Sequence, residues 1–483
     1  MAQITIIGLG PGAPDQLTQE ARNVLSQADE VWLRTVRHPS VPHLPTGPVV
    51  HSFDSLYEKA DSFEAVYAAI VRQVLELGSR AGGVVYAVPG HPLVGESTVT
   101  RVLQEARAAD IPVRIVPGLS FIEPTLSALS LDALDGLQIV DALDVVGGHY
   151  PILNPDMSAL VAQVYSRTVA SELKLVLMNV YPDEHLTALV DAAGTSAETV
   201  IWGPLHEIDH RDATPLTSLY IKPLPSISGF ENFQETVAYL RSPEGCPWDR
   251  EQTHATLRAT LLEETYEVLD AIDADDVDAL REELGDLLLQ VVMHVQIASE
   301  EGEFQMADVI AGIDAKLKHR HPHVWGDVQV ADAQEVTVNW EIIKRQERAD
   351  NGAAQRSLLD GVPKALPALA QAYAYSSRAA RVGLDWIKID AVVEQTKHAL
   401  DALSKAQTPE VQAEMLGDLL FAVGKWSRRL GLDPEGVLRE ANARFARRLR
   451  YVEQAARQMG IALETMSAEE KAHVWDMAAS TIV

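Results

Sequence analysis

The pattern of hydrophobic and polar positions changes near residue 223. Up to that point short apolar runs rich in β-formers alternate with helical stretches, which is typical of an α/β fold. The predicted strands include residues 4–7, 84–88, 113–116, 174–178, 199–202 and 219–221. After Pro223, Pro225 and Gly229 the strand signals stop and long helical periodicities take over. The sequence therefore predicts an α/β domain over residues 1–223, followed by an all-α region.

The helical region contains a short internal repeat. The pentapeptide Leu-Gly-Asp-Leu-Leu at 284–288 recurs at 416–420, each time inside a long helical run. Asn351, Gly352 and Pro363 interrupt the pattern between the two copies. We therefore expect a helical bundle of two repeats, over 224–350 and 351–483. Chance similarity between two leucine-rich helices is the alternative.

Composition narrows the classes of function. The chain has 69 Asp and Glu against 40 Lys and Arg, a net charge of -29, which argues against stable nucleic acid binding. The single cysteine, Cys246, cannot form an internal disulfide, which fits a reducing compartment. The amino terminus starts as a strand rather than a signal peptide, and no apolar run is long enough for a membrane span. These features predict a cytoplasmic protein with no membrane association.

Four carboxylates lie at helical spacing. Glu264 with Glu267, and Glu283 with Asp286, each form an acidic pair within one helical turn. The short acidic connection at 273–276 favours antiparallel neighbouring helices, which brings the two pairs together. Converging carboxylates repel unless a cation compensates them, and ligands that are all oxygen select Mg²⁺ or Mn²⁺.

The alternative is that these acids form only the solvated face of amphipathic helices. Two features favour a site: the acids are poorly balanced by lysines at i+4, and apolar positions surround them. The apolar residues that we expect in the core are Leu257, Leu261, Leu269, Leu280, Leu284, Leu287, Leu288 and Val291.

A longer series of motifs extends the acidic hairpin. The series comprises Cys246-Pro247-Trp248-Asp249, Glu263-Glu264-x-x-Glu267, Glu283-x-x-Asp286, Lys316-Leu317-Lys318-His319-Arg320-His321-Pro322-His323-Val324-Trp325-Gly326-Asp327 and Trp340-Glu341-x-x-Lys344-x-x-Glu347. In order and spacing it resembles the MazG nucleoside triphosphate pyrophosphohydrolases, over roughly residues 230–474. The resemblance implies an all-α, Mg²⁺-dependent, homodimeric enzyme that cleaves nucleoside triphosphates between the α- and β-phosphates. It assigns the metal ligands to Glu264, Glu267, Glu283 and Asp286.

Further residues of these motifs are candidates for the same reaction. Glu263 is adjacent to the metal ligands and could orient the attacking water as a base. Lys316 and Arg320, one helical turn apart, could hold phosphates, although a basic surface turn is the alternative. Trp340 is a candidate to stack on the base, and Trp248 a weaker one, since most tryptophans serve only the core.

The second repeat departs from the pattern. His398, Ala399 and Ala402 stand where the paired glutamates would be, and Met415 replaces the leading acid of the next motif. Only Asp418 is retained. Since one carboxylate cannot hold the ion, we expect this repeat to be structural, with His398 as a surface residue rather than a ligand.

The amino-terminal domain places glycines after three predicted strands. Gly8-Leu9-Gly10-Pro11-Gly12-Ala13 formally satisfies G-x-G-x-x-A, but Pro11 within the loop argues against a dinucleotide-binding turn. Similar Pro-Gly loops follow at 89–92 and 117–120. Glycines at strand ends let a ligand approach the backbone.

These loops resemble the tetrapyrrole methylase family of S-adenosylmethionine enzymes, over about residues 4–223. The resemblance implies two α/β lobes with the methyl donor between them. The candidate cofactor-binding residues are Gly10, Pro11, Gly12, Gly90, His91, Gly118 and Ser120. For His91 a solvent-facing loop position is favoured over a catalytic role. The order of the two domains resembles the bacterial YabN-type proteins.

Two other classes of function stay open. The chain could be a methyltransferase whose helical half only dimerises or regulates, or the helical half could be an interaction scaffold. The four carboxylates favour a bifunctional enzyme, and loss of Mg²⁺ binding would favour a scaffold.

Overall fold

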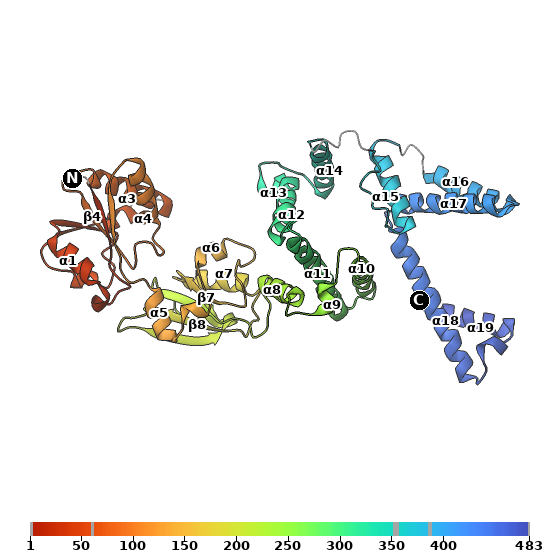
Figure 1. The fold of residues 1–483 in the computed structure, drawn as a ribbon, viewed down its shortest axis with the longest axis horizontal. Coiled ribbons are helices and arrows are strands. Elements are labelled where there is room, and N and C mark those ends of the chain that lie inside the picture. Colours follow the sequence, from red (N-terminus) through yellow and green to blue (C-terminus); the bar gives the residue numbers. More distant parts are fainter. Residues whose placement is uncertain (1–2, 59–61, 351–356, 385–388, 482–483) are drawn as a thin grey trace. The chain divides into compact units, whose positions relative to one another are not determined.

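A computed structural model describes residues 3–58, 62–350, 357–384 and 389–481 (Figure 1). It divides into two compact units, Met1–Ile310 and Ala311–Val483. The division falls within a helix of the all-α region, while the boundaries at 223 and 350 remain predictions. The interrupting residues Asn351 and Gly352 lie outside the described residues.

The first lobe is a five-stranded parallel sheet in the order β3-β2-β4-β1-β5. Its elements are β1 (Ile4–Gly8), α1 (Gln19–Gln27), β2 (Glu30–Leu33), β3 (Val49–Ser52), α2 (Asp54–Tyr57), α3 (Phe63–Gly78), β4 (Val84–Val88), α4 (Ser97–Ala108), β5 (Val113–Val116) and α5 (Ile122–Leu129). Alternation along β1 sends Ile4 and Ile6 into one core cluster and Ile7 into another. Because both faces of this sheet are buried, its strands are continuous apolar runs that sequence patterns detect.

The second lobe has a mixed sheet in the order β6-β7-β10-β8-β9, in which only β6 and β7 pair in parallel. Its elements are β6 (Leu137–Asp141), α6 (Ala142–Val146), β7 (Ser158–Ala162), α7 (Arg167–Leu177), β8 (Leu186–Asp191), β9 (Thr199–Pro204) and β10 (Thr217–Ile221). The α/β fold class of the first half is thus confirmed.

One predicted strand is wrong. Residues 174–178 belong mostly to helix α7, whose first turn is capped by the Ser166 hydroxyl accepting from the Val169 N–H. The buried side chains Val169, Leu173 and Leu177 recur every fourth position, which is helical spacing. The apolar run at the carboxyl end of this helix resembles a strand when it is considered alone. The helical spacing becomes clear only when the preceding turn of the helix is included.

From residue 230 onward every described α or β element is helical, which confirms the all-α second half. The helices are α8 (Phe230–Arg241), α9 (Pro247–Arg250), α10 (Arg258–Asp273), α11 (Val277–Glu300), α12 (Met306–Arg320), α13 (Pro322–Trp325), α14 (Ala333–Asp350), α15 (Ala368–Arg381), α16 (Ile389–Lys405), α17 (Pro409–Leu430), α18 (Pro434–Gln458) and α19 (Ala468–Thr481). Helices α10 and α11 pack together, as do α16 and α17 (Figure 1). The helical hairpin therefore occurs twice, with one Leu-Gly-Asp-Leu-Leu copy in α11 and the other in α17.

The junction between the α/β part and the helices is hydrogen-bonded. The Asp156 carboxylate accepts from the backbone N–H groups of Ser228 at 2.7 Å and Gly229 at 2.8 Å. It also accepts from the Asn232 side-chain amide at 2.6 Å. Gly229 is the N-cap of α8, so an acid of the second lobe satisfies a donor at the start of the first helix.

Within the described residues, no helix is long and apolar enough to cross a membrane.

Candidate functional site

The acidic site is built on the hairpin of α10 and α11. The turn between them has Asp275 in a left-handed conformation with φ 54°, and Asp276 then caps α11 by accepting from the N–H groups of Asp278 and Ala279. Asp and Asn are common at both kinds of position because their short side chains bond to nearby backbone. The acidic connection therefore supplies the tight reversal that makes the two helices antiparallel neighbours.

Three of the four predicted carboxylates converge on this hairpin. Glu264, Glu267 and Glu283 each offer one oxygen, and these oxygens all lie within 4.8 Å of one another. Partial burial, a hydrogen bond with Glu267 and the charges of Asp286, Glu267 and Glu283 raise the pKa of Glu264. Partial burial and neighbouring carboxylates including Glu267 and Asp286 raise the pKa of Glu283 as well. Asp286 thus adds negative charge to the group, although its oxygen lies outside the cluster of three.

This donor set suits a hard divalent cation. The donors are all carboxylate oxygens, which Mg²⁺ and Mn²⁺ prefer, and a cation would relieve the repulsion that raises the two pKa values. Glu264 and Glu283 are half-buried, while Glu267 is exposed and can be reached from solvent. Glu263 is exposed and is not a member of the cluster.

The apolar surroundings differ in part from expectation. Leu257 is buried, but Leu284, Leu288 and Val291 on α11 are 48%, 42% and 41% exposed within the single chain. Their i, i+4, i+7 spacing gives one continuous apolar stripe. The prediction of a core position is wrong for these three, because sequence spacing identifies an apolar face without showing whether the same chain covers it.

The basic and aromatic candidates lie in the second compact unit. The Arg320 guanidinium lies 5.4 Å from the Trp340 ring centroid and pairs with the Glu347 carboxylate at 2.7 Å. Lys344 Nζ lies 4.3 Å from the same ring centroid. Hydrogen bonds from Arg320 lower the pKa of Glu347, and the positive charge of the exposed Lys316 contributes. The structure thus brings Arg320 and Trp340 together. It adds Lys344 and Glu347 to them, two residues that the sequence analysis names as part of the motif without assigning them a role.

The corresponding hairpin of the second repeat offers no comparable cluster among its described residues. His398 on α16 and Asp418 on α17 are both exposed, and neither belongs to a group of potential metal ligands. Trp248, the weaker stacking candidate, is 63% exposed on α9.

The three glycine loops of the first lobe meet backbone to backbone. Gly10 and Gly90 exchange two hydrogen bonds, N–H to O at 3.2 Å and 2.8 Å, and both adopt positive φ. A Cβ on Gly118 would stand 2.6 Å from the Gly90 carbonyl oxygen, so only glycine fits there. The ends of β1, β4 and β5 thus form one surface of backbone, as the loop motifs predict.

The remaining loop candidates have local partners. Nδ1 of the half-buried His91 accepts from the Leu93 N–H at 3.1 Å, which fits a loop-shaping role. Ser120 is 2% exposed and donates its hydroxyl to Glu123 at 2.6 Å. Pro11 and Gly12 complete the first loop, and both are buried.

Buried polar groups near these strand ends escaped the sequence analysis. His38 is 6% exposed, and its Nδ1 lies 2.7 Å from Ser40 Oγ. Burial lowers the pKa of His38 to about 4, although a hydrogen bond to the Gly10 backbone acts in the opposite direction. Arg34 forms an ion pair with the buried Glu96. The polar stretch directly after β2 was the available sequence signal for Arg34 and His38, while Glu96 stands at the start of α4.

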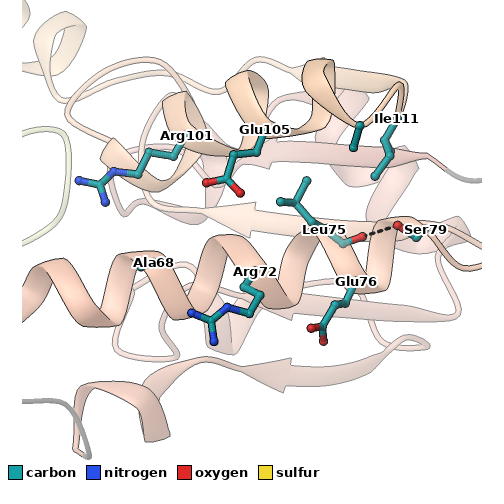
Figure 2. Close-up of a pocket in the computed structure, with 9 residues that line it drawn as sticks. Ala68, Arg72, Leu75, Glu76, Ser79, Arg101, Glu105 and Ile111 are labelled. Carbon is teal, nitrogen blue, oxygen red and sulfur yellow. Dashed lines mark hydrogen bonds between the residues drawn. The ribbon is translucent and has the colours of Figure 1, made fainter.

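A shallow groove of about 400 Å³ lies between α3 and α4. Figure 2 shows Arg72 and Glu76 on α3, and Arg101 and Glu105 on α4, among the residues that line it, with the Ser79 hydroxyl bonded to the Leu75 carbonyl. The groove contains no predicted site residue, and its Arg101 is already paired with Glu64.

Comparison with known proteins finds relatives of both halves of the chain. Residues 3–209 match the family model of tetrapyrrole (corrin/porphyrin) methylases, and residues 252–325 match that of the MazG nucleotide pyrophosphohydrolase domain. The uncharacterized protein YabN of Bacillus subtilis is 40% identical over 489 residues, covering 99% of both chains. The nucleoside triphosphate pyrophosphohydrolase of Escherichia coli K12 is 46% identical over 242 residues, which are 49% of this chain and 91% of that protein. A solved uroporphyrin-III-C-methyltransferase from Thermus thermophilus is 23% identical and covers 46% of this chain and 92% of its own, with a TM-score of 0.36.

The two sheets with glycine loops, joined to a duplicated helical hairpin with an acidic cluster, define a fused two-domain protein. The chain belongs to the YabN-type family, in which a tetrapyrrole methylase domain precedes a MazG domain.

Proposed function

We propose that the helical half is a Mg²⁺-dependent nucleoside triphosphate pyrophosphohydrolase, which releases a nucleoside monophosphate and pyrophosphate. The observation that carries this proposal is the convergence of Glu264, Glu267 and Glu283 within 4.8 Å, with the Asp286 charge beside them. The nucleoside triphosphate pyrophosphohydrolase activity named for the Escherichia coli relative supports it.

The roles of the residues follow from their chemistry. Glu264, Glu267, Glu283 and Asp286 would hold the metal. When bound, Mg²⁺ (or Mn²⁺) would neutralise phosphate charge and lower the pKa of a coordinated water. Glu263, one position outside the cluster, would accept the proton of the attacking water.

Lys316, Arg320 and Trp340 are the residues that we propose for substrate binding. Lys316 and Arg320 carry the positive charge that a triphosphate requires, and Trp340 offers a ring for the base. Because Arg320 is paired with Glu347, it would have to share or exchange that partner when phosphate binds.

A homodimer is part of the proposal. The apolar stripe of Leu284, Leu288 and Val291 runs along the helix that carries Glu283 and Asp286, and a second copy would bury it. We place the protein in the cytoplasm, where it would remove unwanted nucleotides from the pool, with no membrane or stable nucleic acid partner.

For the α/β half we propose S-adenosylmethionine binding at the loops of Gly10, Gly90 and Gly118, and possession of a methyltransferase activity. The close meeting of backbone at these strand ends and the family match support it. Methyl transfer depends mainly on orientation, so the backbone surface would hold the donor without an acid or base.

Product analysis tests the hydrolase. The full chain is incubated with ribo- and deoxyribonucleoside triphosphates, with and without Mg²⁺, beside Glu264→Gln and the matched variant Glu410→Gln on the exposed start of α17. We expect monophosphate and pyrophosphate, lost without metal and in Glu264→Gln but retained in Glu410→Gln. If no triphosphate is cleaved under any metal condition, the helical half is a dimerising or regulatory module of a methyltransferase.

A further inference from the structure

Two histidines form a hydrogen-bonded pair beside the far end of α11. Nδ1 of His254, in the turn before α10, lies 2.7 Å from Nδ1 of His294 on α11. The ring planes differ by only 6°, and the centroids are 5.0 Å apart. Parallel rings whose nearest nitrogens are 2.7 Å apart and whose centroids are 5.0 Å apart lie edge to edge, not one above the other. The two Nδ1 atoms therefore share one proton. Nε2 of His254 is the nitrogen that remains for another partner.

Two glutamates complete a cluster around His254. Donor atoms of His254, Glu301 and Glu303 all lie within 4.8 Å of one another. The end of α11 creates this arrangement: Gly302 adopts φ 72°, its N–H bonds to the Ser299 carbonyl, and the Glu303 N–H bonds to the Ala298 carbonyl at 2.9 Å. These bonds form a Schellman C-cap, which fixes the backbone on which both carboxylates stand.

Arg241 holds both halves of the cluster in place. Its side chain is 6% exposed and pairs with the Glu300 carboxylate at 2.8 Å. The same guanidinium donates to the carbonyl oxygens of Asp249 and Gln252, in the segment that leads to His254. One buried cation therefore fixes the end of α11 relative to the His254 turn, which holds in place the backbone that carries the three donor groups.

The charge balance at this point favours a bound cation. The last turn of α11 contains no basic residue, and the carboxyl end of a helix carries partial negative charge. Glu300 is compensated by Arg241, but no described Lys or Arg forms an ion pair with Glu301 or Glu303. Two carboxylates at a negative helix end, beside an imidazole nitrogen, therefore supply donors whose charge no described Lys or Arg compensates.

We propose that His254, Glu301 and Glu303 form a second metal site, separate from the acidic hairpin, for a divalent transition metal of the Zn²⁺ class. One imidazole with two carboxylates is a mixed N,O donor set that suits Zn²⁺, Mn²⁺ or Co²⁺ better than Mg²⁺, and water would complete the coordination. His254 would bind through Nε2 and donate its Nδ1 proton to His294, which orients the ring as metal-bound histidines require. This site does not depend on the proposed hydrolysis, because it uses none of the same residues.

Metal binding by the full chain tests the site directly. The protein is stripped with a chelator, placed in excess Mg²⁺ so that the acidic hairpin is occupied, and titrated with Zn²⁺ by calorimetry and with Co²⁺ by absorption spectroscopy. The variants are His254→Ala, the double variant Glu301→Gln with Glu303→Gln, and His294→Phe. Glu244→Gln, on an exposed loop glutamate, is the matched control, and Glu264→Gln separates this site from the acidic hairpin.

We expect one tight Zn²⁺ per chain, lost in His254→Ala and in the double glutamine variant. His294→Phe should weaken Zn²⁺ binding by about 10- to 100-fold, because it removes only the orienting partner. Glu244→Gln and Glu264→Gln should bind as the unaltered protein does. Zn²⁺ should also raise the Tm of the unaltered protein but not that of His254→Ala.

Absence of tight Zn²⁺ binding by the unaltered chain would overturn the proposal. So would binding that is unchanged in both His254→Ala and the double glutamine variant. If His254→Ala loses its helical circular dichroism, the double variant decides, since both of its positions are exposed and at the end of a helix.

Discussion

Arg34 and Glu96 form an ion pair with 2.5 Å between Nη1 and Oε2, and the Glu96 side chain is only 2% exposed. The other Glu96 oxygen accepts from the N–H and the hydroxyl of Thr98, at the first turn of α4. Glu96→Ala removes the helix cap and leaves a buried cation without its partner, so the free energy of unfolding should fall by about 3 kcal/mol. Urea unfolding measures this loss. The exposed Glu105→Ala, on the same helix, should change stability by no more than about 0.5 kcal/mol; equal losses in both would contradict the assignment.

Gly8→Ala should disrupt the junction of the three glycine loops. The new Cβ would lie 2.5 Å from the Gly90 carbonyl oxygen and 2.7 Å from the Gly118 nitrogen, and both are backbone atoms that cannot move aside easily. We expect a lower Tm and loss of S-adenosylmethionine binding by calorimetry. Gly82→Ala is the control, because its Cβ would meet nothing within 4 Å. Unimpaired binding by Gly8→Ala would show that the methyl donor does not use these loops.

His38 should make the first lobe less stable in mild acid. Its pKa is about 4 in the folded protein against 6.5 when exposed. Between these pH values the unfolded chain binds a proton here and the folded chain does not, so stability falls as the pH decreases. At 1.36 kcal/mol per pKa unit, the loss from pH 7 to 4 approaches about 3 kcal/mol. Thermal unfolding across this range should show a smaller pH dependence in His38→Gln; an identical dependence would exclude His38 as its source.

Glu264→Gln and Glu263→Gln should differ in metal affinity although the residues are adjacent. Glu264 lies within the cluster and Glu263 does not. The first variant should bind Mg²⁺ at least about 10-fold more weakly, and the second should bind it as the unaltered protein does. Calorimetric titration with Mg²⁺ compares them. A large loss of affinity in Glu263→Gln would mean that the cluster rearranges when metal binds.

Leu288→Asp should shift the protein from dimer toward monomer in sedimentation experiments. The substitution places a charge in the centre of the stripe formed by Leu284, Leu288 and Val291, and burying it against a second copy would be costly. Leu175→Asp is the control, because Leu175 is 64% exposed on α7, which does not carry the stripe. An unchanged dimer in Leu288→Asp would place the interface elsewhere.

Sequence spacing succeeded where one element or one tight turn determines the geometry. The pairs Glu264 with Glu267 and Glu283 with Asp286 are set by helical periodicity, and the short connection at 273–276 sets the hairpin. The buried parallel strands β1, β4 and β5 were predicted for a similar reason, since their apolar runs have no helical period.

Sequence spacing failed where tertiary contact decides. Strand β2 was missed because it has only four residues, and two of them face a partly covered side of the sheet. Its apolar pattern is therefore too short to predict a strand. The pair of His254 and His294 joins residues forty positions apart, and no periodicity relates them. The direction of Glu301 and Glu303 depends on the helix cap that forms at Gly302.

The hydrogen bonds from Ser228, Gly229 and Asn232 to Asp156 bear on any attempt to separate the two halves of the chain. Cutting the chain at the predicted boundary of 223 would remove all three hydrogen-bond donors of Asp156. It would also remove the hydrogen-bond acceptor at the first turn of α8. Each half prepared alone would therefore have unsatisfied hydrogen-bonding groups near the cut. Asp156→Asn together with such a cut would be the gentler dissection, since a neutral amide loses less when its hydrogen-bond donors are gone.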